Sequence, residues 1–112
     1  MCVFCRIANH ELPSDIVMET PRVVAFRDAN PQAPTHVLVI PRKHIRSLAD
    51  IEDEDAGLLG EMVVVATAVA RDAGLVDGGY RVVINTGVRA GQSVFHLHVH
   101  VLGGRAMSWP PG

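Results

Sequence analysis

The stretch of the sequence that most constrains the fold is VFHLHVHVL, residues 94–102. His96, His98 and His100, the histidine triad, alternate there with hydrophobic residues. This alternation predicts a β-strand, because successive side chains of a strand point to opposite faces. We therefore expect the three imidazoles on one face. The hydrophobic residues expected on the opposite, helix-packed face are Phe95, Leu97, Val99 and Val101.

Three imidazoles on one strand face suggest a metal site. On an ideal strand His96 and His100 would be about 13 Å apart, at roughly 3.3 Å rise per residue. Zinc–nitrogen bonds are only about 2.0–2.1 Å long. One ion held by the whole triad is therefore strained, and a division of tasks among the three histidines is favoured. A metal-dependent hydrolase whose triad holds zinc stays open as an alternative.

The two cysteines, Cys2 and Cys5, have the Cys-x-x-Cys spacing. Such a pair forms half of many zinc sites, but the same spacing fits a redox disulfide or two small buried residues. Two histidines would have to complete a tetrahedral metal site. The candidates are His44, in the segment PRKHI, and one end of the triad.

The remaining segments predict an α+β fold. Residues 53–73 predict the long helix, because a hydrophobic stripe follows the helical repeat and acidic residues crowd its start. Short loops between neighbouring β-rich segments favour antiparallel pairing. The stripe consists of Leu58, Met62, Val65 and Val69. The strands are expected at residues 16–20, 23–28, 36–42, 80–86 and 94–102, and a short helix at 3–9.

Length and charge limit the class of protein. The 112 residues suit one domain, residues 1–112. A net charge of −2 offers no basic surplus for nucleic acid or a membrane surface. No apolar run approaches the roughly 18 residues of a membrane span, and no signal peptide is visible. We expect a cytoplasmic protein without a nucleic-acid or membrane partner.

A glycine-containing loop, GVRAGQS, leads into the triad. Gly87 and Gly91 would let the backbone approach a ligand closely, and the Ser93 hydroxyl with the loop N–H groups could hold phosphate oxygens. The glycines alone are equally consistent with an ordinary hairpin loop.

The segments HLHVHVL, AGQSVFHLHVHVLGGR, FRDANPQAPTHVLVIPRKHI and MSWPPG together resemble the histidine triad (HIT) superfamily, and within it the histidine triad nucleotide-binding (Hint) branch. The resemblance covers about residues 2–112. It implies a five-stranded antiparallel sheet with a long and a short helix, and a homodimer that joins two sheets into ten strands. It also implies a purine nucleotide hydrolase that acts on adenosine 5′-phosphoramidates and aminoacyl-adenylates and binds AMP.

The resemblance assigns roles to particular residues. His98 is the nucleophile that attacks the α-phosphorus, and water then hydrolyses the nucleotidyl-histidine. His100, Ser93 and His36 complete the catalytic set. Asp28 would accept bonds from the ribose hydroxyls, although on sequence alone it could be a turn residue. The residues expected at the nucleotide are Phe4, Phe26, Asp28, Leu38, Asn85, Gly91, Gln92, Ser93, His98, His100 and Trp109.

Several of these positions also allow a purely structural role: Asn85 could end its strand, and Phe26 and Leu38 could belong to the core. Trp109 would reach toward the site of a partner subunit. The resemblance also implies a structural zinc ion. Its ligands would be Cys2, Cys5, His44 and His96. A non-catalytic nucleotide-binding dimer of regulatory function stays open as the alternative to an enzyme.

Overall fold

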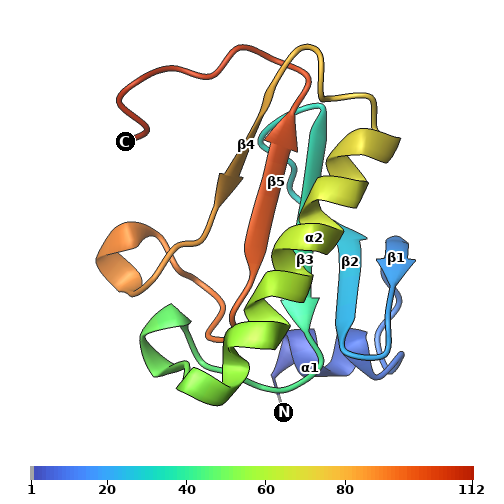
Figure 1. The fold of residues 1–112 in the computed structure, drawn as a ribbon, viewed down its shortest axis with the longest axis vertical. Helices are drawn as coiled ribbons and strands as arrows, with labels where there is room; N and C mark the ends of the chain where they lie inside the picture. The colour runs from blue at the N-terminus through green and yellow to red at the C-terminus, as the bar shows by residue number, and fades with distance from the viewer. Residues whose placement is uncertain (1) are drawn as a thin grey trace.

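A computed structural model describes residues 2–112 and confirms the α+β class (Figure 1). The antiparallel sheet has five strands in the order β1-β2-β3-β5-β4. The helices and strands are α1 (Val3–Ala8), β1 (Ile16–Glu19), β2 (Val23–Arg27), β3 (Thr35–Pro41), α2 (Ala56–Asp72), β4 (Tyr80–Val83) and β5 (Val99–Gly103). Short 3₁₀ turns occur at Leu48–Asp50, Asp53–Asp55 and Val88–Ala90.

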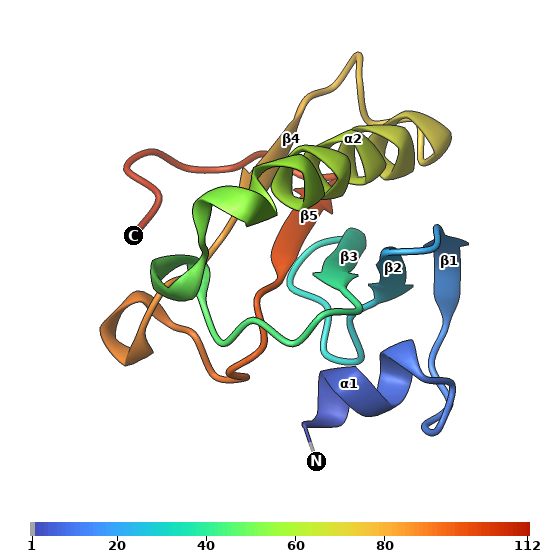
Figure 2. The ribbon, with the colours of Figure 1, turned by 60° about the horizontal axis from the view of Figure 1, so that its bottom comes forward.

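The two helices cover opposite faces of the sheet (Figure 2). Side chains alternate along β2 and β3, so each strand contributes to two separate cores. The α2 side buries the predicted helix stripe, which is confirmed, against Val23, Ala25, Val37, Val39, Val99 and Val101. The α1 side buries Phe4, Ile7 and Ala8 against Val24, Phe26, Leu38 and Ile40. The α1 face is the one that carries the pocket described below.

The last strand is shorter than the alternation predicted. It begins at Val99, and residues 94–98 leave the sheet. Pro41 ends β3 there and has no N–H to donate, while its carbonyl lies 2.8 Å from His96 Nε2. The freed segment bonds instead to the chain that follows β3, through Leu97 N–H and the Ile45 carbonyl. The prediction of a strand from residue 94 is therefore wrong, but the three imidazoles still lie together on the α1 side, opposite Leu97, Val99 and Val101.

Phe95 also differs from expectation. It is only half-buried and lies outside the core beneath α2. The guanidinium carbon of Arg46 lies 4.4 Å from the centre of its ring, which places Phe95 against the post-β3 segment. The bend at residues 94–96 turns this side chain away from the sheet, whereas Leu97, Val99 and Val101 are fully buried as predicted.

Two further boundaries move. The predicted helix 53–73 begins with a 3₁₀ turn, Asp53–Asp55, which a capping box stabilises, since Asp55 Oδ2 accepts the Glu52 N–H at 2.9 Å. The predicted strand 80–86 ends at Val83, since β5, its only neighbour, begins at Val99. No helix within residues 2–112 is both long and apolar enough to cross a membrane.

Candidate functional site

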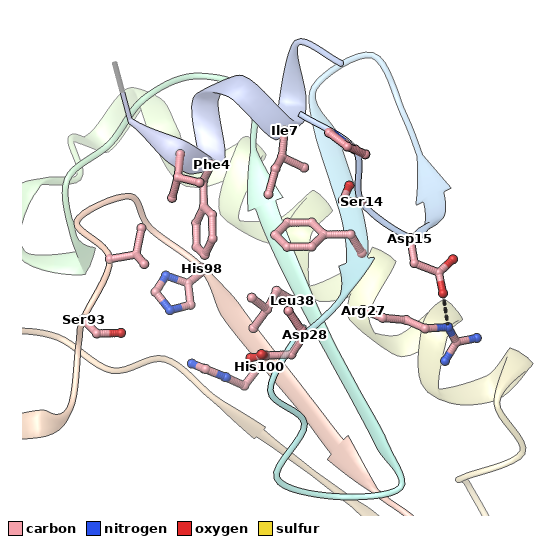
Figure 3. Close-up of a pocket in the computed structure, with 15 residues that line it drawn as sticks. Phe4, Ile7, Ser14, Asp15, Arg27, Asp28, Leu38, Ser93, His98 and His100 are labelled. Carbon is pink, nitrogen blue, oxygen red and sulfur yellow. Dashed lines mark ion pairs between the residues drawn. The ribbon is translucent and has the colours of Figure 1, made fainter. Parts of the chain in front are cut away.

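A pocket of about 640 Å³ opens on the α1 face of the sheet (Figure 3). Its floor comes from three strands in register, because Phe26 lies opposite Leu38 and Leu38 lies opposite His100. Phe4 of α1 covers the floor, with its ring edge toward Phe26 and the two ring centres 5.5 Å apart. A pocket of this size with apolar walls and a few polar groups suits a small organic ligand.

The protonation of His98 is fixed by a backbone atom. Its Nδ1 lies 2.7 Å from the His96 carbonyl oxygen, which can only accept a hydrogen bond. In the neutral ring Nδ1 therefore carries the proton, and Nε2 keeps a free lone pair. Phe4 packs edge-on against the ring at a centroid distance of 5.2 Å and holds it at the pocket wall. His98 thus presents an oriented, nucleophilic nitrogen.

A second backbone group fixes His36 and, through it, His100. The Gln32 N–H donates to His36 Nδ1 at 3.0 Å, so the proton of neutral His36 lies on Nε2. That Nε2 is 2.9 Å from His100 Nδ1, to which it can donate. His100 then carries its own proton on Nε2, a buried atom that has no partner within residues 2–112. The chain of bonds leaves one N–H donor available at the pocket.

Burial keeps these two imidazoles neutral. It lowers the pKa of His100 to about 4, with smaller contributions from His98 and His36 and an opposing one from Asp28. Burial also lowers the pKa of His36, against the opposing effect of the Asp28 carboxylate. Near pH 7 both rings are therefore uncharged, and the His100 ring can offer its Nε2–H as a hydrogen-bond donor but carries no positive charge.

Asp28, His36 and His100 bring possible metal-ligating atoms within 4.8 Å of one another. The hydrogen bonds argue against a cation there. His36 would have to ligate through Nε2, yet this nitrogen carries the proton for as long as Nδ1 accepts the Gln32 N–H. Asp28 takes part in the same network, since its Oδ2 lies 3.4 Å from His36 Nε2 while its Oδ1 accepts the Asn30 N–H at 2.8 Å. We therefore treat these three residues as a hydrogen-bonded group.

A second cluster, the Cys2–Cys5–His44–His96 cluster, lies beside the pocket. His44 Nδ1 and His96 Nδ1 are 3.1 Å apart, and Cys5 Sγ is 3.3 Å and 3.4 Å from them. Cys2 Sγ lies 3.5 Å from His96 Nδ1. Tetrahedral zinc with bonds of about 2.0–2.3 Å brings its ligand atoms to about 3.3–3.8 Å from one another. The cluster therefore has nearly the dimensions of a closed zinc site.

The backbone also orients His96 within this cluster. Its Nε2 donates to the Pro41 carbonyl at 2.8 Å, which leaves the Nδ1 lone pair directed at the two thiols. Both cysteines are free thiols. Within residues 2–112, no group of three possible metal ligands contains two members of the triad. This separation disfavours the alternative in which the triad itself holds the metal.

The remaining expected residues fall into two sets. Phe4, Phe26, Asp28, Leu38 and Ser93 line the pocket together with His98 and His100. The residues that do not line it are Asn85, Gly91, Gln92 and Trp109.

Asn85 lies next to Gly91, whose Cβ, if it had one, would be 3.9 Å from Asn85 Nδ2. The Gln92 side chain is buried, and its amide is occupied by loop hydrogen bonds. Trp109 is 82% exposed and stands beside Arg81, outside the pocket of its own chain. A role for Trp109 at a nucleotide therefore requires a second subunit.

Other residues line the pocket without having been expected. Ile7 follows Phe4 by one helical turn, so helical spacing could have identified it. Asp15 and Arg27 form an ion pair at 3.1 Å at the opposite end of the pocket from His98 (Figure 3). Only the pairing of β1 with β2 brings these two residues together. The distance between Asp15 and Arg27 in the sequence does not predict that they form an ion pair.

The pKa of His100 predicts an effect of pH on stability. Between its ordinary value of 6.5 and about 4, the unfolded chain takes up a proton at this ring and the folded chain does not. The contribution of His100 to the free energy of unfolding is therefore fully present above pH 6.5 and is lost as the pH falls toward 4. His100→Gln should reduce this loss of unfolding free energy by up to about 3 kcal/mol. Urea unfolding of both proteins at pH 7.5 and 4.5 measures the difference, and equal losses would contradict the assignment.

The chain is similar to proteins of one family. The model of the HIT domain matches residues 9–107. A 14 kDa zinc-binding protein of Zea mays is 52% identical over 112 residues, covering 98% of this chain and 87% of that protein. An uncharacterized HIT-like protein of Synechococcus elongatus is 49% identical over 110 residues, covering 98% of this chain and 96% of that protein.

Solved structures agree in fold. A HIT family hydrolase from Legionella pneumophila superposes with a TM-score of 0.98 at 48% identity, over 100% of both chains. A histidine triad nucleotide-binding protein from Candida albicans superposes with a TM-score of 0.83 at 32% identity, over 98% of this chain and 83% of the other. The sheet, the pocket histidines and these matches lead to one conclusion: the chain belongs to the HIT domain family.

Proposed function

We propose that this protein hydrolyses adenosine 5′-phosphoramidates and aminoacyl-adenylates through a covalent nucleotidyl intermediate on His98. The observation that carries the proposal is the free Nε2 lone pair of His98, held at the wall of a nucleotide-sized pocket by the His96 carbonyl. Two relatives support the class, since the Legionella pneumophila protein is called a hydrolase and the Candida albicans protein nucleotide-binding.

The pocket offers a place for each part of the substrate. The apolar wall that Phe4 and Phe26 form together suits a purine ring, and the Asp28 carboxylate in the same pocket can accept bonds from ribose hydroxyls. With the sugar on Asp28, we place the α-phosphate beside His98 and Ser93, which lie at the same end of the pocket (Figure 3). We assign to the His100 N–H a hydrogen bond to a phosphate oxygen, which stabilises the charge that develops there.

The reaction balances over two displacements. His98 Nε2 forms a bond to the α-phosphorus, the P–N bond of the phosphoramidate breaks, and the nitrogen leaves with its electron pair and takes up a proton from solvent. Water then forms a new P–O bond as the Nε2–P bond breaks and gives up a proton to solvent, which releases AMP and restores neutral His98. The His96 carbonyl supports both steps, because it stabilises the positive charge of the ring while the nucleotide is attached.

Replacement of the nucleophile tests the proposal. His98→Asn should lower kcat on an adenosine phosphoramidate by at least about 10³-fold, because it removes Nε2, and should leave AMP binding measurable. Intact-mass spectra of quenched turnover mixtures should show an adenylylated wild-type chain and no adduct on the variant. His10→Asn is the matched control, since His10 is an exposed histidine at positive φ, which asparagine tolerates.

Two results of that experiment would contradict the enzyme. A wild-type protein that binds AMP without turnover would favour the non-catalytic, regulatory interpretation. Full activity in His98→Asn would exclude this residue as the nucleophile.

We also propose that the Cys2–Cys5–His44–His96 cluster holds a structural zinc ion. The tetrahedral dimensions, the soft thiol ligands and the orientation of His96 support this, as does the name of the Zea mays relative. Bound zinc would be closed to substrate and would fasten α1 to the chain after β3. Because Phe4 lies between the two cysteines, it would share this restraint and keep its place over the pocket.

Loss of one ligand tests the zinc proposal. Wild-type protein should contain about one zinc per chain by elemental analysis, and Cys5→Ser should contain much less. The Tm of Cys5→Ser should fall by at least about 4 °C, the shift that about 1 kcal/mol causes in a domain of this size. Equal zinc content in the two proteins would contradict the ligand assignment. The affinity for adenosine, which depends on Phe4, should fall with the metal.

Finally, we propose a homodimer formed through the β4 edge of the sheet. β4 has a neighbour on one side only, and Val82 on it is 43% exposed. Val63 and Val64 of α2 are 52% and 68% exposed, unusual for hydrophobic residues in the middle of a helix. Pairing of two β4 edges would join two sheets and satisfy the unpaired backbone groups.

A charge on this surface should separate the subunits. Val64→Glu should convert the dimer to a folded monomer in light scattering at micromolar concentration, because burial of an unpaired carboxylate at an interface is costly. Val76→Glu is the control, since Val76 is 56% exposed in the loop between α2 and β4. A monomeric wild-type protein, or a Val64→Glu protein that remains dimeric, would contradict the proposed interface.

A further inference from the structure

The Gly87–Val94 loop, which carries Ser93 to the edge of the pocket, contains one short 3₁₀ turn and no strand. Its backbone has positive φ at Gly87 (88°) and Gly91 (100°), so neither residue has the conformation of a β-strand. A loop of this kind is usually mobile. Something other than sheet pairing must therefore hold Ser93 against the phosphate position.

The Gln92 side chain supplies this restraint. It is 4% exposed, and all its amide groups are used inside the protein. Oε1 accepts the Gly87 N–H at 2.9 Å, while Nε2 donates to the Arg46 carbonyl at 2.9 Å and to the Val94 carbonyl at 3.2 Å. One side chain thus joins both ends of the loop to the segment that follows β3.

The backbone of Gln92 strengthens the closure. Its N–H donates to the Gly87 carbonyl at 3.1 Å, so Gln92 and Gly87 are joined by two reciprocal hydrogen bonds. A buried amide with three partners is costly to replace, because its loss leaves buried backbone groups without a hydrogen-bond partner. The loop is therefore held rigidly at the residue immediately before Ser93.

The anchor of Gln92 is the same segment that serves the other parts of the site. Residues 44–46 contribute His44 to the Cys2–Cys5–His44–His96 cluster, the Ile45 carbonyl to Leu97 N–H, and the Arg46 carbonyl to Gln92. Ser93 and the segment that bears His98 are consequently positioned from one common support. A shift of either would change the distance between the nucleophile and the group that holds the phosphate.

We propose that Gln92 is a positioning residue that presets the phosphate-binding loop, and that it acts without touching the nucleotide. The proposal rests on the proposed function for the location of the phosphate, but not on turnover. It replaces the expectation that the Gln92 side chain contacts the ligand. If the proposal holds, Gln92 contributes to recognition of the phosphate and not to recognition of the nucleoside.

Comparison of AMP with adenosine tests this selectivity. Gln92→Met keeps the side-chain volume and removes all three amide hydrogen bonds. We expect calorimetry to show AMP binding weakened about 10-fold or more and adenosine binding within about twofold of wild type. The rate of adenylylation of His98 should fall by up to about 10²-fold, the usual effect of a small misplacement. Val88→Ala, an exposed change in the same loop, should alter none of these values.

The outcomes separate a positioning role from a merely structural one. Equal weakening of AMP and adenosine would show a general loss of the pocket and overturn the proposal, and so would unchanged AMP binding. A wild-type protein without turnover, together with the expected AMP-to-adenosine split, would refute the proposed reaction and leave the role of Gln92 intact.

A measurement on the unaltered protein covers the case in which Gln92→Met does not fold. Amide hydrogen exchange of the wild-type protein without ligand should show Gly87 N–H protected, because its acceptor is the Gln92 side chain. Rapid exchange of Gly87 in the ligand-free protein would overturn the proposal, since the loop would then not be preset.

Discussion

The hydrogen bond from His98 Nδ1 to the His96 carbonyl is the interaction on which the chemistry of this site depends. A carbonyl cannot donate, so it assigns the proton of the ring without a titratable partner. The Pro41 carbonyl fixes the proton of His96 on Nε2 in the same way. At His36 the backbone group is instead a donor, because the Gln32 N–H binds Nδ1 and so leaves the proton on Nε2. The backbone thereby gives chemically identical side chains different tasks: a nucleophile, a candidate metal ligand and a relay to His100.

The sheet makes this arrangement possible because its two faces are independent. Residues of β2 and β3 that point toward α2 form the larger core and hold the strands in register. Residues that point toward α1 need not fill their space completely, and they enclose the pocket. The Cys2–Cys5–His44–His96 cluster brings α1, which covers the pocket, next to the chain that follows β3. The larger core thus lies on the α2 side of the sheet, and the pocket lies on the α1 side.

Much of this was accessible from the sequence. The α+β class and the stripe of α2 follow from periodicity, and the shared motifs indicate the HIT family. The spacing of Cys2 and Cys5 suggested a cluster, but two histidines could be added only as candidates, and the resemblance selected them. The pocket positions of Phe4, Phe26 and Asp28 came from the same source.

The remainder depended on contacts between distant segments. Alternation predicted a strand from residue 94, whereas the structure begins it at Val99, because Pro41 cannot continue the ladder and His96 occupies its carbonyl. The buried amide of Gln92 and the ion pair of Asp15 with Arg27 have partners that no local pattern identifies. Periodicity reports which face a residue occupies, and it is silent about the hydrogen bonds made there.

Residue 96 combines two contributions that belong to different parts of the molecule. Its imidazole lies in the metal-like cluster, whereas its carbonyl fixes the tautomer of His98. A substitution changes the first contribution and, so long as the backbone keeps its path, preserves the second, because every amino acid carries a carbonyl. In evolutionary terms the cluster is therefore expendable without loss of the tautomer of His98. A lineage can abandon the cysteines and this imidazole together and keep the free Nε2 of His98 at the pocket, provided that other packing holds α1 in place.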